Sequence, residues 1–200
     1  GGSAGRRGHK DQQPGHGGGL GITYNAETPP GPDEYARAIV ETAKTRSLKL
    51  ILEPGRVIVG NAGILVTRVL YRKPGKDKEF VIADAGMNDL LRPSLYKAFH
   101  AVKPVQQRAA GSITADLVGP ICESGDFLAS ERVMADVTAG DLLAVMSAGA
   151  YAYTMSSNYC SRLKVPEVMV KAGEFSVVRE RQQYEDLIRG ESIPPFLDAN

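Results

Sequence analysis

The chain has few cysteines, almost no net charge and no long apolar run. Cys122 and Cys160 are the only cysteines among its 200 residues, too few for the disulfide framework of a small secreted domain. No apolar run approaches the roughly 20 residues that a membrane-spanning helix needs, and no signal peptide opens the sequence. We therefore expect a protein of the reducing cytoplasm. In an exported protein the two cysteines would be free to pair.

Positive and negative side chains balance. The 24 Lys and Arg residues and the 23 Asp and Glu residues leave a formal net charge of +1, and both signs are interspersed along the chain. This balance gives no field strong enough to attract nucleic acid or an anionic membrane, so neither is expected as a partner. The ligand has therefore to be deduced from a binding site.

The N-terminal third of the chain has two textures. Residues 1–16 are glycine-rich, polar and basic, with Ala4 as the sole apolar residue, so we expect them to be disordered or extended. A glycine-rich loop follows from Gly17, and then a helix is predicted because apolar residues recur at helical spacing, namely Tyr35, Ala38, Ile39 and Ala43. The run LKLILEPGR, ended by proline and glycine, predicts a buried strand. Residues 17–62 thus read as a loop, a helix and a strand.

The remaining residues, 63–200, have the texture of a mostly β domain. Strand-like runs rich in Val, Ile and Leu are separated by turns, namely ILVTRVLYR, EFVIADA, RVMADV, DLLAVM and FSVVRE. KPGKDK fits a hairpin connection between the first two runs, and AGD fits a tight turn before LLAVM. Short helices are expected around residues 93–98 and 183–189. The predicted fold class is mixed α/β.

Two glycine motifs are candidates for binding a phosphate. The first is the triplet Gly17, Gly18 and Gly19. The second, Glu53-Pro54-Gly55-Arg56, follows the predicted strand, where glycine lets backbone N–H groups approach an anion and arginine can clamp it with two hydrogen bonds. Taken alone, each is more simply explained as a flexible turn, with a solvated arginine in the second case.

Three further motifs carry reactive or ionisable side chains. Arg92 and Tyr96 are four residues apart, on one face if the segment is helical, so that both could reach one carboxylate. Cys122 and Glu123 lie before a glycine turn, where a thiol could act as an acid and a carboxylate could hold an amine. Tyr151 follows a turn of small residues. The simpler readings are a surface arginine, a buried cysteine and structural tyrosines.

The joint occurrence of these motifs favours the functional reading. In this order and at these spacings, GGGLGI, EPGR, RPSLY, CESGD, and GAY followed by SSNY resemble the diaminopimelate decarboxylases, which are pyridoxal-phosphate enzymes of fold type III. The resemblance covers about residues 17–197. It implies that residues 17–62 are the last part of a (β/α)8 barrel that binds pyridoxal 5′-phosphate, and that residues 63–200 are a C-terminal β-barrel or sandwich domain with a terminal helix.

The resemblance also implies a role for each motif. The two glycine motifs, residues 17–19 and 53–56, would contact the cofactor phosphate, with Arg56 also reaching the substrate. Arg92 and Tyr96 would hold a substrate carboxylate, and Tyr151 would contact both cofactor and substrate. No metal is implied.

Cys122 and Glu123 resemble a pair that one subunit of a homodimer contributes to the active site of the other. Cys122 would then be the proton donor and Glu123 would bind the substrate amine. The implied reaction converts meso-2,6-diaminopimelate to L-lysine and carbon dioxide, a step of lysine biosynthesis.

Two departures from the family pattern stand out. The family's cofactor-bearing lysine and its stacking histidine both precede the glycine motif, and residues 1–16 match neither region. Lys10 lies in polar, glycine-rich surroundings that do not resemble a barrel strand, so we do not assign it this role. Cys160 stands where the family typically has asparagine, a change that touches no expected catalytic role.

Two other functions stay open at this point. A related decarboxylase of ornithine, arginine or carboxynorspermidine is disfavoured by Glu123 and Arg92, because a second arginine suits the distal carboxylate of diaminopimelate. A non-catalytic interaction module that dimerises with a full-length homologue is compatible with the retention of Cys122 and Glu123. We expect the isolated chain to be inactive as a decarboxylase, and its barrel portion to be unstable because its edges are uncovered.

Overall fold

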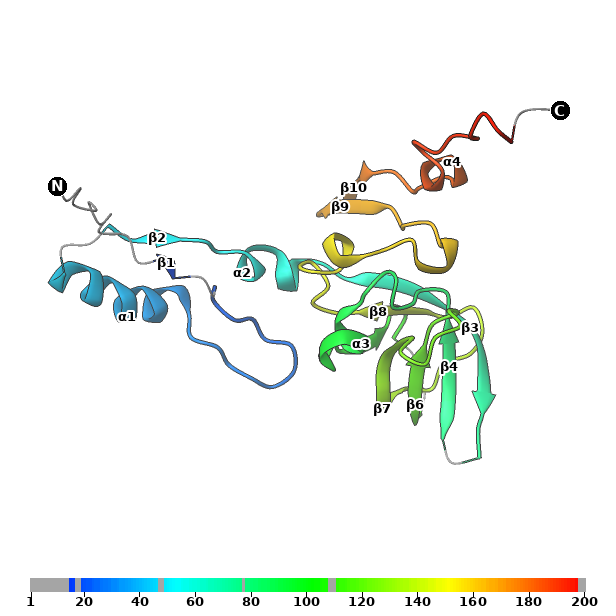
Figure 1. The fold of residues 1–200 in the computed structure, drawn as a ribbon. Helices are drawn as coiled ribbons and strands as arrows, with labels where there is room; N and C mark the ends of the chain where they lie inside the picture. The colour runs from blue at the N-terminus through cyan, green and yellow to red at the C-terminus, as the bar shows by residue number, and fades with distance from the viewer. Residues whose placement is uncertain (1–14, 17–18, 47–48, 77, 108–110, 198–200) are drawn as a thin grey trace, which may run out of the picture.

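The computed structural model describes residues 15–16, 19–46, 49–76, 78–107 and 111–197. The first part of the chain forms an extended arm that projects from a β-sheet domain, and a hairpin followed by a terminal helix lies above the sheet in this view (Figure 1). We call residues 15–62, as far as they are described, the N-terminal arm.

The arm contains one long helix and two very short strands. Helix α1 (Pro32–Thr45) begins with proline at its first position, has Asp33 and Glu34 in its first turn and has Lys44 in its last, an order that suits the helix dipole. The predicted helix is confirmed. Strand β1 (Gly15–His16) pairs in parallel with β2 (Ile51–Leu52).

The expectation of a buried strand at residues 48–56 is wrong in two respects. Strand β2 is only two residues long, and Ile51 and Leu52 are 40% and 44% exposed. A parallel strand is normally covered on both faces, and within the described residues β2 has just β1 beside it and no second layer that buries it. Strand β1 has no apolar pattern, because backbone pairing does not require one. Of residues 1–16, the first 14 lie outside the described residues.

The β domain is built on a six-stranded sheet in the order β5-β8-β3-β4-β6-β7. Its strands are β3 (Leu65–Pro74), β4 (Glu79–Ala83), β5 (Val102–Pro104), β6 (Ser112–Val118), β7 (Phe127–Ala135) and β8 (Leu142–Val145). All neighbours are antiparallel except β4 and β6, which run in parallel. The two outer strands, β5 and β7, contact each other, so the sheet is nearly closed. This confirms the mostly β character of this half.

Four of the five predicted strand runs form strands of this sheet, and FSVVRE forms β10 (Glu174–Arg179), which pairs with β9 (Glu167–Lys171) in a separate hairpin. The predicted hairpin at KPGKDK is present, with the Gly75 N–H donating to the Lys78 carbonyl at 2.8 Å. Strands β5, β6 and β9 were not predicted. The two expected short helices are present as α3 (Arg92–Tyr96) and α4 (Tyr184–Leu187). The described chain also has a one-turn helix, α2 (Arg56–Val59), and three 3-10 turns, η1 (Gly60–Ala62), η2 (Tyr153–Met155) and η3 (Tyr159–Ser161).

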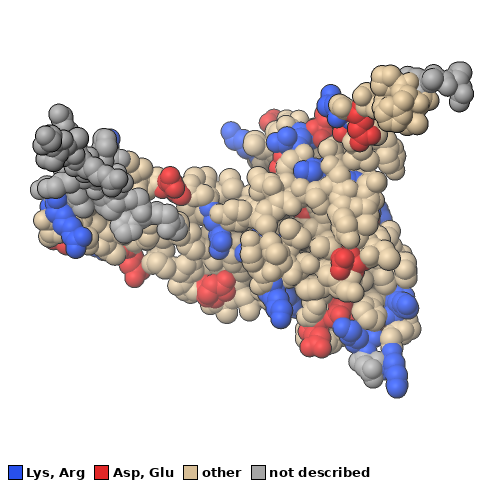
Figure 2. Space-filling model, viewed as in Figure 1, with Lys and Arg blue, Asp and Glu red and all other residues tan. Residues whose placement is uncertain are grey.

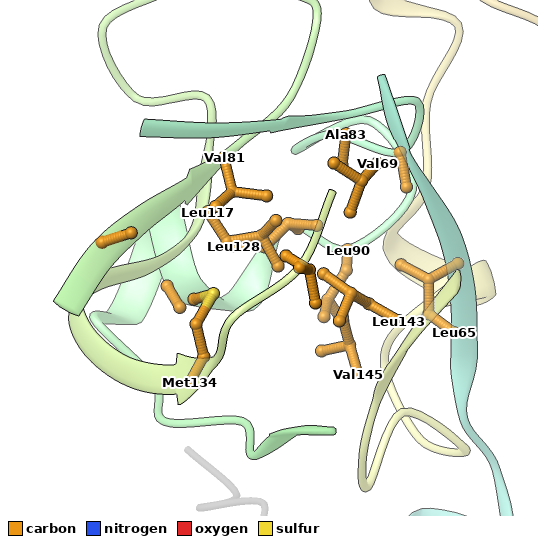
Figure 3. Close-up of a cluster of buried hydrophobic side chains, with 14 of the residues drawn as sticks. Leu65, Val69, Val81, Ala83, Leu90, Leu117, Leu128, Met134, Leu143 and Val145 are labelled. Atoms are coloured by element: carbon orange, nitrogen blue, oxygen red, sulfur yellow. The ribbon is translucent and has the colours of Figure 1, made fainter. Parts of the chain in front are cut away.

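One apolar core fills the nearly closed sheet. Side chains from all parts of the sheet point toward one another, as Figure 3 shows for Leu65, Val69, Val81, Leu90, Leu117, Leu128, Met134, Leu143 and Val145. The largest of them are fully buried, as in the close-packed interior of other domains.

The side chains of the C-terminal hairpin, by contrast, are mostly exposed to solvent. All six residues of β10 are exposed, including Phe175 at 75% and Val178 at 56%. Exposed apolar strands of this kind are surfaces that another layer normally covers. None of the helices in the described part of the chain is long and apolar enough to span a membrane.

Strand β7 offers a test of the core. Replacement of the fully buried Leu128 by Ala is expected to lower the free energy of unfolding by about 2–5 kcal/mol, because it removes apolar contacts and leaves a cavity. Replacement of Val133, which lies on the same strand and is 68% exposed, by Ala should change it by less than about 0.5 kcal/mol. Urea denaturation followed by circular dichroism measures both, and equal effects would contradict this assignment of the core.

Candidate functional site

A cavity of about 240 Å³ lies where the arm meets the β domain. Its lining combines two cations, two phenols and a thioether from three separate segments, namely Arg56, Arg92, Tyr96, Tyr151 and Met155. Arg56 begins α2 at the end of the arm, Arg92 and Tyr96 are the first and last residues of α3, and the other two follow β8. Four of the five are residues that the sequence motifs singled out.

Helix α3 presents two of these side chains together. Arg92 and Tyr96 are one helical turn apart and line the same cavity, as their spacing predicted. Arg92 is 7% exposed and is therefore not a surface arginine, whereas Tyr96 is 61% exposed and does not pack in the core. Both simpler readings of this motif are wrong.

Tyr151 is positioned by close backbone packing between the arm and the domain. The Ala148 N–H donates to the Gly63 carbonyl at 2.8 Å, and the Gly149 N–H donates to the Gly60 carbonyl at 3.1 Å. A Cβ on Gly149 would lie 1.8 Å from the carbonyl oxygen of Val59, so only glycine permits this approach. The chain then turns through Tyr151, whose φ of 62° is costly for a tyrosine, a kind of local strain found often at functional sites.

The glycine motifs lie side by side. Gly19 packs against the backbone of residues 53–55, where a Cβ on Gly19 would be 3.7 Å from the Gly55 nitrogen and 3.8 Å from the Glu53 oxygen. A Cβ on Gly55 would be 3.8 Å from the Tyr151 hydroxyl. Gly17 and Gly18 lie outside the described residues. The side-chain-free backbone beside a phenol and Arg56 is a surface that fits a phosphate group.

Two residues that the sequence did not single out, Tyr24 and His100, complete the cluster. The guanidinium carbon of Arg92 lies 4.5 Å from the centre of the Tyr24 ring, and that of Arg56 lies 5.8 Å from it. The Arg56 carbon also lies 5.4 Å from the centre of the Tyr151 ring, so Arg56 is not a freely solvated arginine. The Tyr24 and His100 rings meet edge to face at 5.2 Å. In the sequence, the short distance from Gly19 to Tyr24 was a signal that could have marked Tyr24 as a site residue.

His100 is fully buried and is held on both sides of its ring. Its Nε2 lies 2.9 Å from Arg92 Nη1, and its Nδ1 lies 2.8 Å from the Met146 carbonyl. Burial lowers the pKa of His100, as do the positive charges of Arg92 and Arg132, and the carbonyl of Met146 opposes them. Neutral imidazole is therefore favoured at neutral pH.

The Cys122–Glu123 motif lies in the loop between β6 and β7. Asp126, 4% exposed, anchors this loop by accepting hydrogen bonds from the Met87 N–H and the Ile121 N–H, both at 2.6 Å. A Cβ on Gly119 would lie 2.5 Å from both carboxylate oxygens, so glycine is required there as well. The loop is thus rigidly attached at its base.

Cys122 and Glu123 themselves are exposed and do not line the cavity of their own chain. Gly125 of the same loop packs against Ser94, two residues from Arg92 and therefore on the other side of α3. The Tyr159 hydroxyl lies 3.4 Å from Glu123 Oε2, and the negative charge of Glu123 is the largest of the causes that raise the pKa of Tyr159. The reading of Cys122 as a small buried residue is wrong.

The family described as pyridoxal-dependent decarboxylase, C-terminal sheet domain, matches residues 23–149. The chain belongs to this family. The matched residues include Tyr24, Arg56, Arg92, His100 and the Cys122 loop, and they end just before Tyr151.

The relatives that this chain matches are more than twice as long as it is. It is 52% identical over 179 residues to a diaminopimelate decarboxylase of Pseudomonas aeruginosa, a match that spans 90% of this chain and 43% of that protein. The crystal structure of a diaminopimelate decarboxylase from Helicobacter pylori complexed with L-lysine is 41% identical, with a TM-score of 0.80 over 88% of this chain and 43% of that one. The structure of the diaminopimelate decarboxylase from M. jannaschii in co-complex with L-lysine is 34% identical in sequence. Its TM-score is 0.85, and the match covers 92% of this chain and 43% of that one. The chain corresponds to their C-terminal part, as the resemblance indicated.

Asp126 can be tested as the anchor of the Cys122 loop. Replacement of Asp126 by Ala is expected to lower the free energy of unfolding by about 3 kcal/mol, because it leaves the buried Ile121 N–H and the partly buried Met87 N–H without this acceptor. Replacement of Asp136, whose ion pair with Arg72 is partly exposed, by Ala should cost at most about 1 kcal/mol. Chemical denaturation measures both, and faster hydrogen exchange at Ile121 should accompany the first change alone.

Proposed function

We propose that this chain is the C-terminal part of a diaminopimelate decarboxylase, an enzyme that converts meso-2,6-diaminopimelate to L-lysine and carbon dioxide with pyridoxal 5′-phosphate. The observation that carries the proposal is the cavity in which two arginines and two tyrosines meet at the junction of arm and β domain. The L-lysine bound by two of the structural relatives is the product of this reaction and supports the same ligand class here. We place the enzyme in the cytoplasm.

The cofactor would be held by the glycine-rich side of the junction. Its phosphate would contact the backbone of residues 17–19 and 53–55, together with Arg56 and the Tyr151 hydroxyl, which Gly55 leaves accessible. When bound, the cofactor supplies an electron sink for the carbanion that decarboxylation leaves. In this reading residues 17–62 are the last part of the cofactor-binding barrel, and residues 63–200 are the C-terminal β domain.

The substrate carboxylate would be bound by the buried side of the cavity. A guanidinium group matches a carboxylate with two parallel hydrogen bonds, and Arg92 offers one that is largely removed from water. The phenol of Tyr96, one turn away on α3, can add a third hydrogen bond. Arg56 and Tyr151 would contact the substrate next to the cofactor.

Cys122 and Glu123 would act in the partner subunit of a homodimer. Both are exposed, neither lines the cavity of its own chain, and their loop is anchored at its base by Asp126. Cys122 would deliver a proton from its thiol to the carbon that lost carbon dioxide, and Glu123 would bind the substrate amine. Arg92 together with Glu123 favours diaminopimelate over the amino acids that related decarboxylases use.

The isolated chain is expected to be catalytically inactive, because none of its lysines matches the family's cofactor-bearing lysine. Mixed with pyridoxal 5′-phosphate, it should give no visible absorbance band that borohydride abolishes, and no lysine from meso-2,6-diaminopimelate. Absorbance spectroscopy and amino-acid analysis measure the two. Substantial lysine formation by the purified chain would overturn this expectation.

The shared site can be tested by mixing chains. A full-length relative in which the cysteine matching Cys122 is replaced by Ala should regain lysine formation when this chain is added, because this chain would supply Cys122 to the relative's active site. The same chain carrying Cys122→Ala is the matched control and should restore nothing. Restoration of activity by both chains, or by neither, would contradict the proposed role of Cys122. A gain without any requirement for Cys122 would instead support a non-catalytic interaction module.

A further inference from the structure

Arg92 is a buried cation, and the partners of its guanidinium in the described part of the chain are uncharged groups. Among the described residues no carboxylate forms an ion pair with it, although the residue is only 7% exposed. Its neighbours are the imidazole of His100 and the ring of Tyr24. A buried charge without a counter-ion is costly, and an anion that enters the cavity would relieve that cost.

The hydrogen bonds of His100 leave one choice of tautomer. A guanidinium can only donate, so Nε2 must accept from Arg92 with its lone pair, and a carbonyl can only accept, so Nδ1 must carry the proton that is donated to Met146. The ring is therefore neutral. The neutral imidazole holds the Arg92 guanidinium in place and leaves its positive charge intact, whereas a carboxylate in the same position would neutralise that charge.

Tyr24 holds the other side of the guanidinium with its ring. The ring comes from the arm, lies 4.5 Å from the Arg92 guanidinium carbon and packs on the edge of His100. Its hydroxyl is buried and has no hydrogen-bond partner among the described residues, so the aromatic face is the part of Tyr24 that Arg92 uses.

We propose that His100 and Tyr24 are positioning residues for Arg92, which they hold from two sides in the orientation that binds an anionic carboxylate. This inference rests on the proposed function for the identity of the ligand, but its geometry does not depend on it. Arg132 holds the backbone of His100, since its Nη1 donates to the His100 carbonyl at 2.8 Å and its guanidinium lies over the Phe99 ring.

The arrangement should respond to acid. The groups that face His100 are the cations Arg92 and Arg132, the Met146 carbonyl and the Tyr24 ring, with no carboxylate among the described residues. Protonation of Nε2 would replace the lone pair by an N–H that points at the guanidinium. Since the pKa of His100 is lowered in the folded chain, the unfolded chain takes up the proton first, and stability falls as the pH drops below about 6.5.

Two pairs of substitutions separate positioning from packing. Glutamine can place an oxygen near the position of Nε2 and still accept from Arg92, whereas asparagine can place its amide near Nδ1 and reaches only Met146. Phenylalanine keeps the ring of Tyr24, whereas leucine keeps only bulk. His100→Asn and Tyr24→Leu should weaken the binding of meso-2,6-diaminopimelate by about tenfold or more. His100→Gln and Tyr24→Phe should stay within about threefold of the unmodified chain.

The experiment combines calorimetry with ¹⁵N magnetic resonance of the imidazole in the full 200-residue chain, after thermal melts confirm that each variant folds. At pH 7.5 we expect His100 to carry its proton on Nδ1, with Nε2 unprotonated. A proton on Nε2, or equal affinity for all four variants and the unmodified chain, would overturn the inference. If the unmodified chain has the expected tautomer but binds no diaminopimelate, the proposed ligand is contradicted while the geometry of Arg92 is supported.

Discussion

The close backbone contact between the arm and the β domain is the constraint on which the site depends. Because Gly149 carries no side chain, its backbone can lie against the Val59 carbonyl, and the hydrogen bonds from residues 148 and 149 then lock the two segments together. This contact brings Tyr151 beside Gly55 and Arg56, and it brings Tyr24 of the arm under Arg92. Without this contact Arg56 of the arm and Arg92 of the β domain would not be held at the same cavity.

The electrostatic character of the cavity follows from what surrounds its arginines. Aromatic faces and a neutral imidazole contact the guanidinium groups, and Glu123 of the β6–β7 loop does not line the cavity. Both positive charges therefore remain available to an anion. On the face that Figure 2 shows, basic and acidic side chains are interspersed, so no single sign of charge dominates that face.

The sequence predicted those parts of the molecule whose signals are local. Helix α1, the strands of the sheet with continuous apolar runs, and the convergence of Arg92 with Tyr96 all follow from spacing along one segment. Strand β6 was missed because polar residues interrupt its apolar pattern. Tyr24 and His100 were missed because their importance comes from contacts between segments that lie far apart in the chain. The exposure of β2 could not be foreseen, since burial depends on layers that a strand's own residues do not specify.

The contacts of Tyr24 have a consequence for how the arm and the cavity depend on each other. The Tyr24 ring lies 4.5 and 5.8 Å from the guanidinium carbons of Arg92 and Arg56, and it packs on the edge of the His100 ring. Arg92 and His100 belong to the β domain, whereas Tyr24 belongs to the arm. A displacement of the arm would therefore remove the same ring from Arg92 and from His100 at once.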